Sequence, residues 1–370
     1  MSRFFDLVSK PARNLSSQKI PAAPAAVQER QSQLVKLDSN ESPFGPSPLA
    51  LDAMRAMLAS SGSYPDDDCT PLREKLAAHH ELRPEQVLVT AGSTGLLSLL
   101  CQTLLAPGLN AVTSERSFIV YSMAVQAAGG QLIEAPMQGD SFDLDRVRAS
   151  IDSNTRIVFI ANPNNPTGTM LAAPLLERFL ANVPAHVVVI LDEAYYEYAA
   201  HFASLRRIVY SRSLQYVCEG LSLVVLRTFS KAFGLAGLRV GYGMGPAELL
   251  GYCARMRNTF SVSSVAQAAA LAALDDPQHV QRVVESNAVQ SRDLAQGLSA
   301  LGFRVVPTAA NFVFCDVGRD AASFADKLLQ EGIAVRPLGS WGAPTCIRIT
   351  IGKPEQNRAF LDAARRITAA

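Results

Sequence analysis

Short runs of aliphatic residues recur along this 370-residue chain, and they constrain its fold more than any other feature. They are rich in Val and Ile and have no polar face, which suits strands of a parallel sheet covered by helices on both sides. The clearest runs span residues 87–90, 157–161, 187–191, 223–226 and 238–242. Helix-like segments such as residues 96–105 alternate with them. The sequence therefore predicts an α/β fold built on a mostly parallel sheet.

The pattern changes after about residue 275. A long helix is predicted over residues 278–301, and a last helix ends the chain. Short strands are predicted between them, at residues 303–307, 311–316, 333–336 and 346–351. We interpret this as a smaller α+β domain over residues 276–370, preceded by a large cofactor-binding domain over residues 41–275. Residues 1–40 are expected to form an N-terminal arm that packs with the small domain.

Composition excludes several classes of protein. The net charge of +1 argues against nucleic-acid binding. The six cysteines form no C-x-x-C pair and the five histidines no H-E-x-x-H, so we expect no metal site and no disulfide framework. No apolar stretch approaches the roughly 20 residues that span a bilayer, and no signal peptide is evident. We therefore expect a cytoplasmic protein with no membrane partner.

Polar residues follow three of the predicted strands. In parallel sheets, ligands bind outside the carboxyl ends of the strands. Ser93 and Thr94 lie between two glycines at a predicted helix start, where backbone N–H groups can bind phosphate. Asn165 lies in an Asn/Pro-rich turn, and Asp192 ends an apolar strand, where a carboxylate needs a cation or a donor. An ordinary strand–helix turn, a plain turn and a helix cap are the structural alternatives.

Lys231 lies on a glycine-containing turn between two predicted strands. A lysine can form an imine with a carbonyl cofactor. Its neighbours Thr228, Ser230 and Arg239 can hold an anion. A solvated loop lysine is the alternative. The chemical role is favoured only because other segments of the chain supply the remaining residues of one site.

Together these residues supply what pyridoxal 5'-phosphate needs. Lys231 would hold the aldehyde as an imine, and Asp192 would keep the pyridine nitrogen protonated, which makes the ring an electron sink. Asn165 and Tyr195 would hydrogen-bond the phenolic oxygen of the ring. The phosphate would be held by Ser93, Thr94, Thr228, Ser230 and Arg239.

At this point the chain resembles a known family, the fold type I pyridoxal-phosphate aminotransferases, and within it the histidinol-phosphate aminotransferase branch. The resemblance runs from about Arg13 to the C-terminal helix. It is carried by the motifs at residues 40–48, 64–66, 162–168, 192–195 and 228–242, in that order and spacing.

The resemblance implies further roles. Phe118 matches the aromatic residue that stacks on the pyridine ring, although a core phenylalanine is the simpler reading. Tyr64 matches a tyrosine that reaches the cofactor phosphate of the neighbouring subunit, which implies a homodimer with shared active sites. Arg348 matches the arginine that binds the substrate carboxylate, and Arg336 matches a second substrate-side arginine. For Arg336 a surface ion pair is the alternative.

The implied reaction is transamination of an L-amino acid or amino alcohol phosphate with 2-oxoglutarate. Histidinol phosphate is the first expectation for the amino donor. Two departures keep an aromatic (phenylalanine or tyrosine) aminotransferase open as the alternative. The phosphate turn, residues 92–95, is closer to the aspartate and aromatic form, and residues 17–19 lack the tyrosine that many members carry after residues 13–16.

Other functions remain as competitors. A threonine-phosphate decarboxylase-like lyase would share the cofactor residues. A nicotinamide dehydrogenase is disfavoured because the glycines at 241–245 lack the G-x-G-x-x-G spacing. A DNA-binding regulator is disfavoured because too few residues precede Asn40 and no basic stripe occurs.

Overall fold

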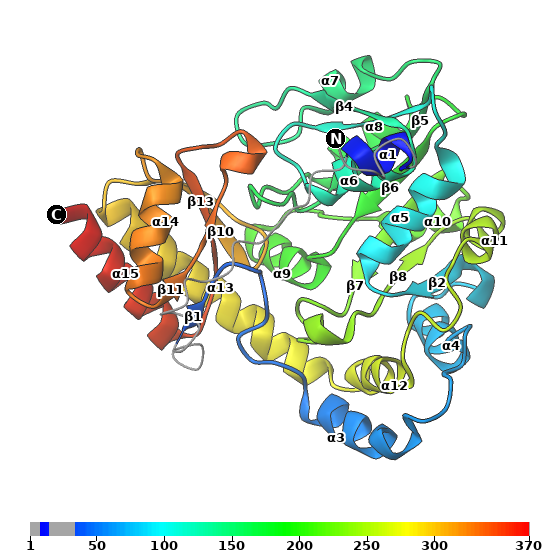
Figure 1. Ribbon diagram of the computed structural model, residues 1–370, viewed down its shortest axis with the longest axis horizontal. Coiled ribbons are helices and arrows are strands. Elements are labelled where there is room, and N and C mark those ends of the chain that lie inside the picture. The colour runs from blue at the N-terminus through cyan, green and yellow to red at the C-terminus, as the bar shows by residue number, and fades with distance from the viewer. Residues whose placement is uncertain (1–7, 15–33, 370) are drawn as a thin grey trace.

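A mixed but mostly parallel sheet organises the larger part of the molecule (Figure 1). The computed structural model describes residues 8–14 and 34–369. Within them this sheet has seven strands in the order β2-β8-β7-β6-β5-β3-β4. Only β8 runs against its neighbours. Along the chain the strands are β2 (Val87–Thr90), β3 (Asn110–Ser114), β4 (Gln131–Ala135), β5 (Thr155–Ala161), β6 (Val188–Asp192), β7 (Leu223–Thr228) and β8 (Gly241–Met244).

The predicted strands can be compared with these elements. Four of the five predicted runs coincide with β2, β5, β6 and β7 to within two residues at either end. The prediction at residues 238–242 was wrong at its start. Leu238 ends a 3₁₀ turn (Ala236–Leu238), and Arg239 has a φ of 55°, so the strand begins only at Gly241. The strands β3 and β4 were not predicted, because polar residues interrupt their apolar pattern.

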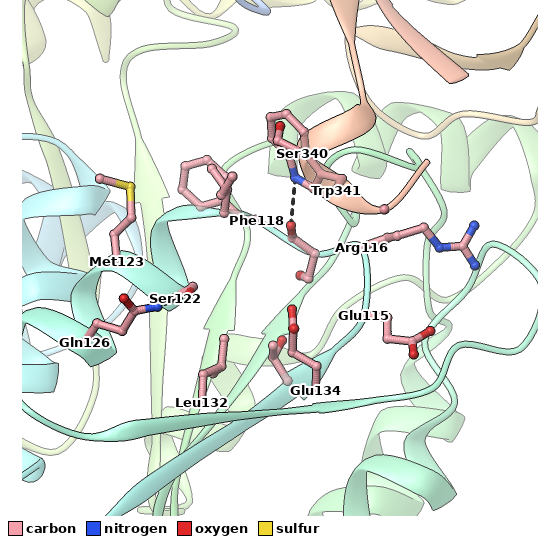
Figure 2. Close-up of a pocket in the computed structure, with 14 residues that line it drawn as sticks. Glu115, Arg116, Phe118, Ser122, Met123, Gln126, Leu132, Glu134, Ser340 and Trp341 are labelled. Carbon is pink, nitrogen blue, oxygen red and sulfur yellow. Dashed lines mark hydrogen bonds between the residues drawn. The ribbon is translucent and has the colours of Figure 1, made fainter. Parts of the chain in front are cut away.

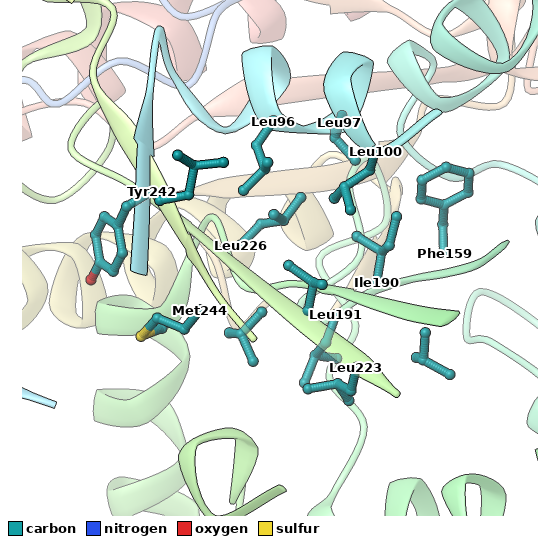
Figure 3. Close-up of a cluster of buried hydrophobic side chains, with 14 of the residues drawn as sticks. Leu96, Leu97, Leu100, Phe159, Ile190, Leu191, Leu223, Leu226, Tyr242 and Met244 are labelled. Carbon is teal, nitrogen blue, oxygen red and sulfur yellow. The ribbon is translucent and has the colours of Figure 1, made fainter. Parts of the chain in front are cut away.

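Helices flank this sheet, and their apolar faces form its core. Figure 3 shows Leu96 and Leu100 of α5 lying over Ile190 and Leu226 of the sheet. All four side chains are fully buried, and each such burial contributes roughly 1.5–3 kcal/mol. The flanking helices are α3 (Pro48–Met57), α4 (Thr70–His79), α5 (Ser93–Leu104), α6 (Val120–Ala127), α7 (Leu144–Ala149), α8 (Ala173–Leu180), α9 (Tyr196–Arg206), α10 (Ser213–Cys218), α11 (Ala247–Arg255) and α12 (Ser264–Ala273).

A smaller antiparallel sheet lies beside the larger part, at the left in Figure 1. Its order is β12-β13-β10-β9, and a separate parallel pair joins β1 to β11. The strand predicted at 333–336 is therefore two strands in two sheets. The elements are β1 (Val35–Lys36), α13 (Pro277–Ala300), β9 (Arg304–Val306), β10 (Phe312–Asp316), α14 (Ala321–Gln330), β11 (Ile333–Ala334), β12 (Arg336–Pro337), β13 (Cys346–Thr350) and α15 (Pro354–Ala369).

Two separate apolar clusters underlie the two sheets. The buried residues of the larger one fall between Ala50 and Ala273, and those of the smaller one are Leu37 and residues between Leu294 and Ala364. The domain boundaries at residues 40 and 275 stay predictions. Of the predicted arm, residues 1–7 and 15–33 lie outside the described residues. Residues 17–19, noted above because they contain no tyrosine, are among them. The short helix α1 (Lys10–Asn14) lies against α6.

No helix in the described part of the chain combines the length and the apolar character that a membrane span requires. All six cysteines are free, and five of them are buried.

Gly234 holds the turn that carries Lys231 against the loop around Gly45. Its φ is +71°, and a Cβ there would lie 2.1 Å from the carbonyl oxygen of Gly45. We expect Gly234→Ala to lower the free energy of unfolding by at least about 1–2 kcal/mol, the cost of a left-handed alanine alone. Urea denaturation would measure this. Gly237→Ala is the matched control, since a Cβ at that position meets nothing within 4 Å, and it should change the free energy by less than about 0.5 kcal/mol. Equal effects of both changes would contradict the packing argument.

Candidate active site

A cavity of about 350 Å³ opens at the carboxyl ends of β2, β5, β6 and β7. It gathers side chains from segments far apart in the sequence and from both sheets. Twelve of the residues singled out in the sequence line it: Ser93, Thr94, Phe118, Asn165, Asp192, Tyr195, Thr228, Ser230, Lys231, Arg239, Arg336 and Arg348. Ser39, Asn40, Ile119 and Trp341 line it as well.

One end of the cavity is an anion cradle. The helix α5 begins at Ser93 with no side-chain cap, so its first N–H groups face the cavity without a capping oxygen. The Arg239 guanidinium donates to Thr94 Oγ1 at 3.4 Å and to Ser230 Oγ at 3.3 Å. The Thr228 hydroxyl lies 3.0 Å from Ser230 Oγ. Long contacts to one cation, with hydroxyls around it, suit a phosphate bound between them.

Gly92 allows this cradle to form. Its φ is +77°, and a Cβ there would lie 2.6 Å from Arg239 Nη2. A side chain at this position would displace the guanidinium from the start of α5. The glycine is therefore required both for the backbone conformation and for the close approach of Arg239.

Asp192 is the buried acid of the site. Tyr121 Oη donates to its Oδ2 at 2.9 Å, and the backbone N–H of Ala194 donates to its Oδ1 at 3.1 Å. Burial raises the pKa of Asp192 to about 6, although both hydrogen bonds act in the opposite direction. A cationic or N–H partner in the cavity would favour the ionised carboxylate. The geometry therefore suits an acid opposite a protonated ring nitrogen.

Lys231 extends from the turn after β7 into the middle of the cavity. Its Nζ donates to the carbonyl oxygens of Asn40 at 3.1 Å and of Ser39 at 3.4 Å. Burial, together with the charges of Arg348 and Arg239, lowers the pKa of Lys231 to about 7. A large fraction of the amine is therefore neutral near pH 7, which is the form that attacks a carbonyl or accepts a proton.

Arg348 is a buried cation on β13 of the smaller sheet. Its Nη1 donates to Asn165 Oδ1 at 2.7 Å, and its Nη2 donates to the carbonyl oxygen of Asp38 at 2.8 Å. Its buried Nε has no hydrogen-bond partner, and no carboxylate pairs with the guanidinium among the residues described. Burial, aided by Arg336, lowers the pKa of Arg348 to about 10. A buried guanidinium without a paired anion is costly, so the site is suited to an anionic ligand.

Arg336 lies beside Arg348 in the cavity wall and also makes an ion pair. It lines the cavity, and its Nη2 lies 3.4 Å from Asp38 Oδ2 in a half-buried ion pair. Asp38 thus contacts both arginines, through its side chain and through its carbonyl oxygen.

Three residues of the site were not predicted from the sequence, namely Asn40, Tyr121 and Trp341. Asn40 donates to Tyr195 Oη at 2.9 Å, while Asn165 Nδ2 lies 3.3 Å from the same oxygen. Tyr121 holds Asp192, and Trp341 closes the wall near Phe118. Asn40 belongs to a motif that carried the resemblance, and its φ of 55° is one that asparagine tolerates. Tyr121 lies three residues after Phe118 and had no signal of its own. Trp341 had no signal beyond being the sole tryptophan of the chain.

Tyr64 is the one predicted site residue that does not line this cavity. Its side chain is 82% exposed and stacks on Phe260 with ring centroids 4.5 Å apart. Arg257 anchors the neighbouring loop through ion pairs of 3.1 Å to Asp67 and 3.3 Å to Asp68. The exposed Tyr64 phenol is therefore not part of the wall of this cavity.

The residues present fit the expected cofactor. An uncapped helix start with an arginine, a buried acid, a lysine with a depressed pKa and a flat aromatic wall face one another across a single cavity. Residues 8–14 and 34–369 contain no group of three His, Cys, Asp or Glu side chains that could hold a metal ion.

Comparisons with known proteins agree with this geometry. Residues 32–363 match the family described as aminotransferase class I and II. A histidinol-phosphate aminotransferase 2 of Pseudomonas aeruginosa is 43% identical over the full length of both chains. A histidinol-phosphate aminotransferase of Moorella thermoacetica is 40% identical over 95% of this chain and 90% of its own.

Two solved structures share the fold. The histidinol-phosphate aminotransferase of Sinorhizobium meliloti in complex with pyridoxal-5'-phosphate superimposes with a TM-score of 0.87 at 28% identity, covering 96% of this chain and 99% of the other. The aspartate aminotransferase of Thermus thermophilus with maleate gives a TM-score of 0.82 at 27% identity, covering 97% and 99%.

The depressed pKa of Lys231 can be tested on protein stripped of any cofactor. Only the neutral amine is acylated, so the labelling of Lys231 by acetic anhydride should rise with pH around a midpoint near 7. Peptide mass spectrometry would follow the site. Because the charge of Arg348 contributes to the depression, Arg348→Met should raise the midpoint. A midpoint near 10.5, the ordinary value for lysine, would contradict the burial argument.

Proposed function

The chain belongs to the class I and II aminotransferases, and on that premise we propose that it transfers the amino group of histidinol phosphate to 2-oxoglutarate with pyridoxal 5'-phosphate as cofactor. Relatives that are 40–43% identical over at least 94% of this chain bear the name histidinol-phosphate aminotransferase, which supports this donor. The S. meliloti structure, which contains pyridoxal-5'-phosphate, supports the cofactor.

One observation carries the proposal: the cavity holds more positive than negative charge. Arg239 and Arg348 pair with no carboxylate among the described residues, and Arg336 pairs with Asp38. Lys231, with its pKa lowered to about 7, adds only part of a charge. Asp192 is the sole acid among the described residues that line the cavity. Such a site favours ligands with several negative charges. A cofactor phosphate, a donor phosphate and the two carboxylates of 2-oxoglutarate all meet that demand.

The roles of the cofactor-binding residues follow from their positions. Pyridoxal phosphate, when bound, supplies an electron sink for the bonds at the α-carbon of the donor. Ser93, Thr94, Thr228, Ser230 and Arg239 would bind its phosphate in the cradle at α5. Asp192 would hold a proton at the ring nitrogen, and Tyr121 keeps the carboxylate oriented for this. Phe118 would cover one face of the ring, and Asn165 and Tyr195 would donate to its phenolic oxygen.

Lys231 would anchor the cofactor and then act as the base. The amine of Lys231, when not bonded to the cofactor, would take the α-proton of the donor and deliver it to the aldehyde carbon of the cofactor. A pKa near 7 matches a base that must both accept and release a proton at neutral pH. Arg348, with Arg336 beside it, would bind the anionic group of each substrate in turn, the phosphate of the donor or a carboxylate of 2-oxoglutarate.

An aromatic amino donor is the second candidate. The turn Gly92-Ser93-Thr94-Gly95 supports it, because its hydroxyls take the place of the acidic pair usual in the histidinol-phosphate branch. Both donors would undergo the same reaction with the same cofactor-binding residues. They would differ only in the residues that contact the side chain of the donor.

We also propose that the enzyme is a homodimer with shared active sites. Tyr64 supports this, because its exposed ring cannot serve the cavity of its own chain and would reach the phosphate cradle of the partner. The free state of all six cysteines suits a reducing compartment, so we place the enzyme in the cytoplasm.

A panel of amino donors with 2-oxoglutarate would test the reaction. We expect kcat/KM for histidinol phosphate to exceed that for phenylalanine by at least about tenfold, since a site that pairs with a phosphate penalises donors lacking one. Lys231→Ala should reduce kcat/KM by at least about 1000-fold, because both the anchor and the base are lost. Release of CO2 without consumption of 2-oxoglutarate would instead indicate a lyase, and a preference for phenylalanine would indicate the aromatic enzyme.

The shared site can be tested by mixing two defective variants. Lys231→Ala and Tyr64→Ala should each be impaired alone. In a mixed dimer, one site combines Lys231 of one chain with Tyr64 of the other and is intact. Unfolding and refolding an equal mixture should therefore restore about a quarter of the wild-type activity, since half the dimers are mixed and one site in each works. Activity no greater than the average of the two variants would rule out sharing through Tyr64.

A further inference from the structure

Trp341 is a planar side chain in the cavity wall to which the proposed function gives no role. It ends the 3₁₀ turn Gly339–Trp341, which lies between Arg336 on β12 and Arg348 on β13. The residue therefore enters the cavity from the same side as the two arginines. It is the sole tryptophan of the chain.

The position of the indole is fixed by a contact between the two sheets. Its Nε1 donates to the carbonyl oxygen of Ser117 at 3.0 Å, and Ser117 directly precedes Phe118 (Figure 2). The residue is half-buried, so the ring is held without being enclosed. Trp341 and Phe118 are thus neighbours, although they come from opposite parts of the molecule.

A second cavity of about 510 Å³ adjoins the first at this point. It shares three wall residues with the first cavity, namely Phe118, Ile119 and Trp341. Figure 2 shows Trp341 and Phe118 on one side of this outer space and Leu132 and Glu134 on the other. A group that leaves the first cavity past Trp341 therefore has room to extend.

The remaining walls of the first cavity leave few directions for a donor side chain. The amine must lie near Lys231 and the anionic group near Arg348, while the cofactor residues fill the opposite end. Among the lining side chains without another role, Ile119 and Trp341 are the large apolar ones. They also line the second cavity.

We propose that Trp341 is a specificity-determining residue that contacts the planar ring of the amino donor as this ring passes from the first cavity toward the outer one. The inference rests on the proposed transaminase function and narrows its substrate class to donors with a flat ring. Imidazole and phenyl rings share this chemistry. A flat ring gains from offset contact with an aromatic face, whereas a linear side chain does not.

The proposal predicts an effect on one half of the reaction only. 2-Oxoglutarate has no ring, so it can bind at Arg348 without touching the indole. Loss of the aromatic face should therefore lower kcat/KM for the donor and leave kcat/KM for 2-oxoglutarate nearly unchanged. A merely structural role for Trp341 would lower both.

The test compares Trp341→Leu with Trp341→Phe in the holoenzyme, with histidinol phosphate and phenylalanine as donors. Leucine keeps apolar bulk but has no flat face, and phenylalanine keeps a flat face but cannot donate to Ser117. Trp341→Leu should lower kcat/KM for the preferred donor by about tenfold, and Trp341→Phe by no more than about threefold. The value for 2-oxoglutarate should stay within about twofold in both variants.

Three results would overturn the proposal: no change for the donor in Trp341→Leu, an equal loss for donor and 2-oxoglutarate, or a loss in Trp341→Phe as large as in Trp341→Leu. The last would mean that the hydrogen bond to Ser117 matters rather than the ring. Wild-type protein that transaminates no donor would refute the proposed function instead, and this inference with it. The donor most affected by Trp341→Leu identifies the ring that the indole contacts.

Discussion

A buried ion pair between Glu193 and Arg227 ties together the strand ends on which the site is built. Arg227 donates through Nε at 3.0 Å and Nη2 at 2.8 Å to Glu193 Oε2, and both side chains are almost fully buried. Ser213 donates to the same carboxylate, and the guanidinium lies 3.3 Å from the ring centre of Tyr196. Removing one partner of such a pair leaves an uncompensated buried charge, at a cost of roughly 3–5 kcal/mol.

The pair acts on the site through the alternation of side chains along a strand. Glu193 follows Asp192 at the end of β6, and Arg227 precedes Thr228 at the end of β7. Successive residues of a strand point to opposite sides. The ion pair therefore fixes β6 and β7 from one side, while Asp192 and Thr228 face the cavity on the other. Arg227 is thus paired behind the cavity, whereas Arg239 and Arg348 within it pair with no carboxylate among the described residues.

The sequence predicted most of the larger sheet and most of the cavity, because both depend on local signals. Continuous apolar runs mark β5, β6 and β7, and polar residues at their ends mark the cavity wall. The features that the sequence did not predict depend on long-range packing. Arg239 was placed in a strand, yet its backbone takes a left-handed conformation that brings the guanidinium over Gly92. Trp341 and Asp38 could not be assigned, since their contacts with Ser117 and Arg348 join segments more than 200 residues apart.

The site is therefore built from residues of both sheets. The larger sheet supplies the cradle, the acid and the lysine, whereas the smaller one supplies Arg348, Arg336 and the turn with Trp341. Asp38 and Asn40 bridge the two, because Asp38 contacts both arginines while Asn40 contacts Lys231 and Tyr195. Any movement of the smaller sheet would shift Arg348 and Arg336 relative to Lys231. Since the charges of Arg348 and Arg239 help to keep the amine of Lys231 neutral, the geometry of the substrate site and the basicity of the lysine are coupled.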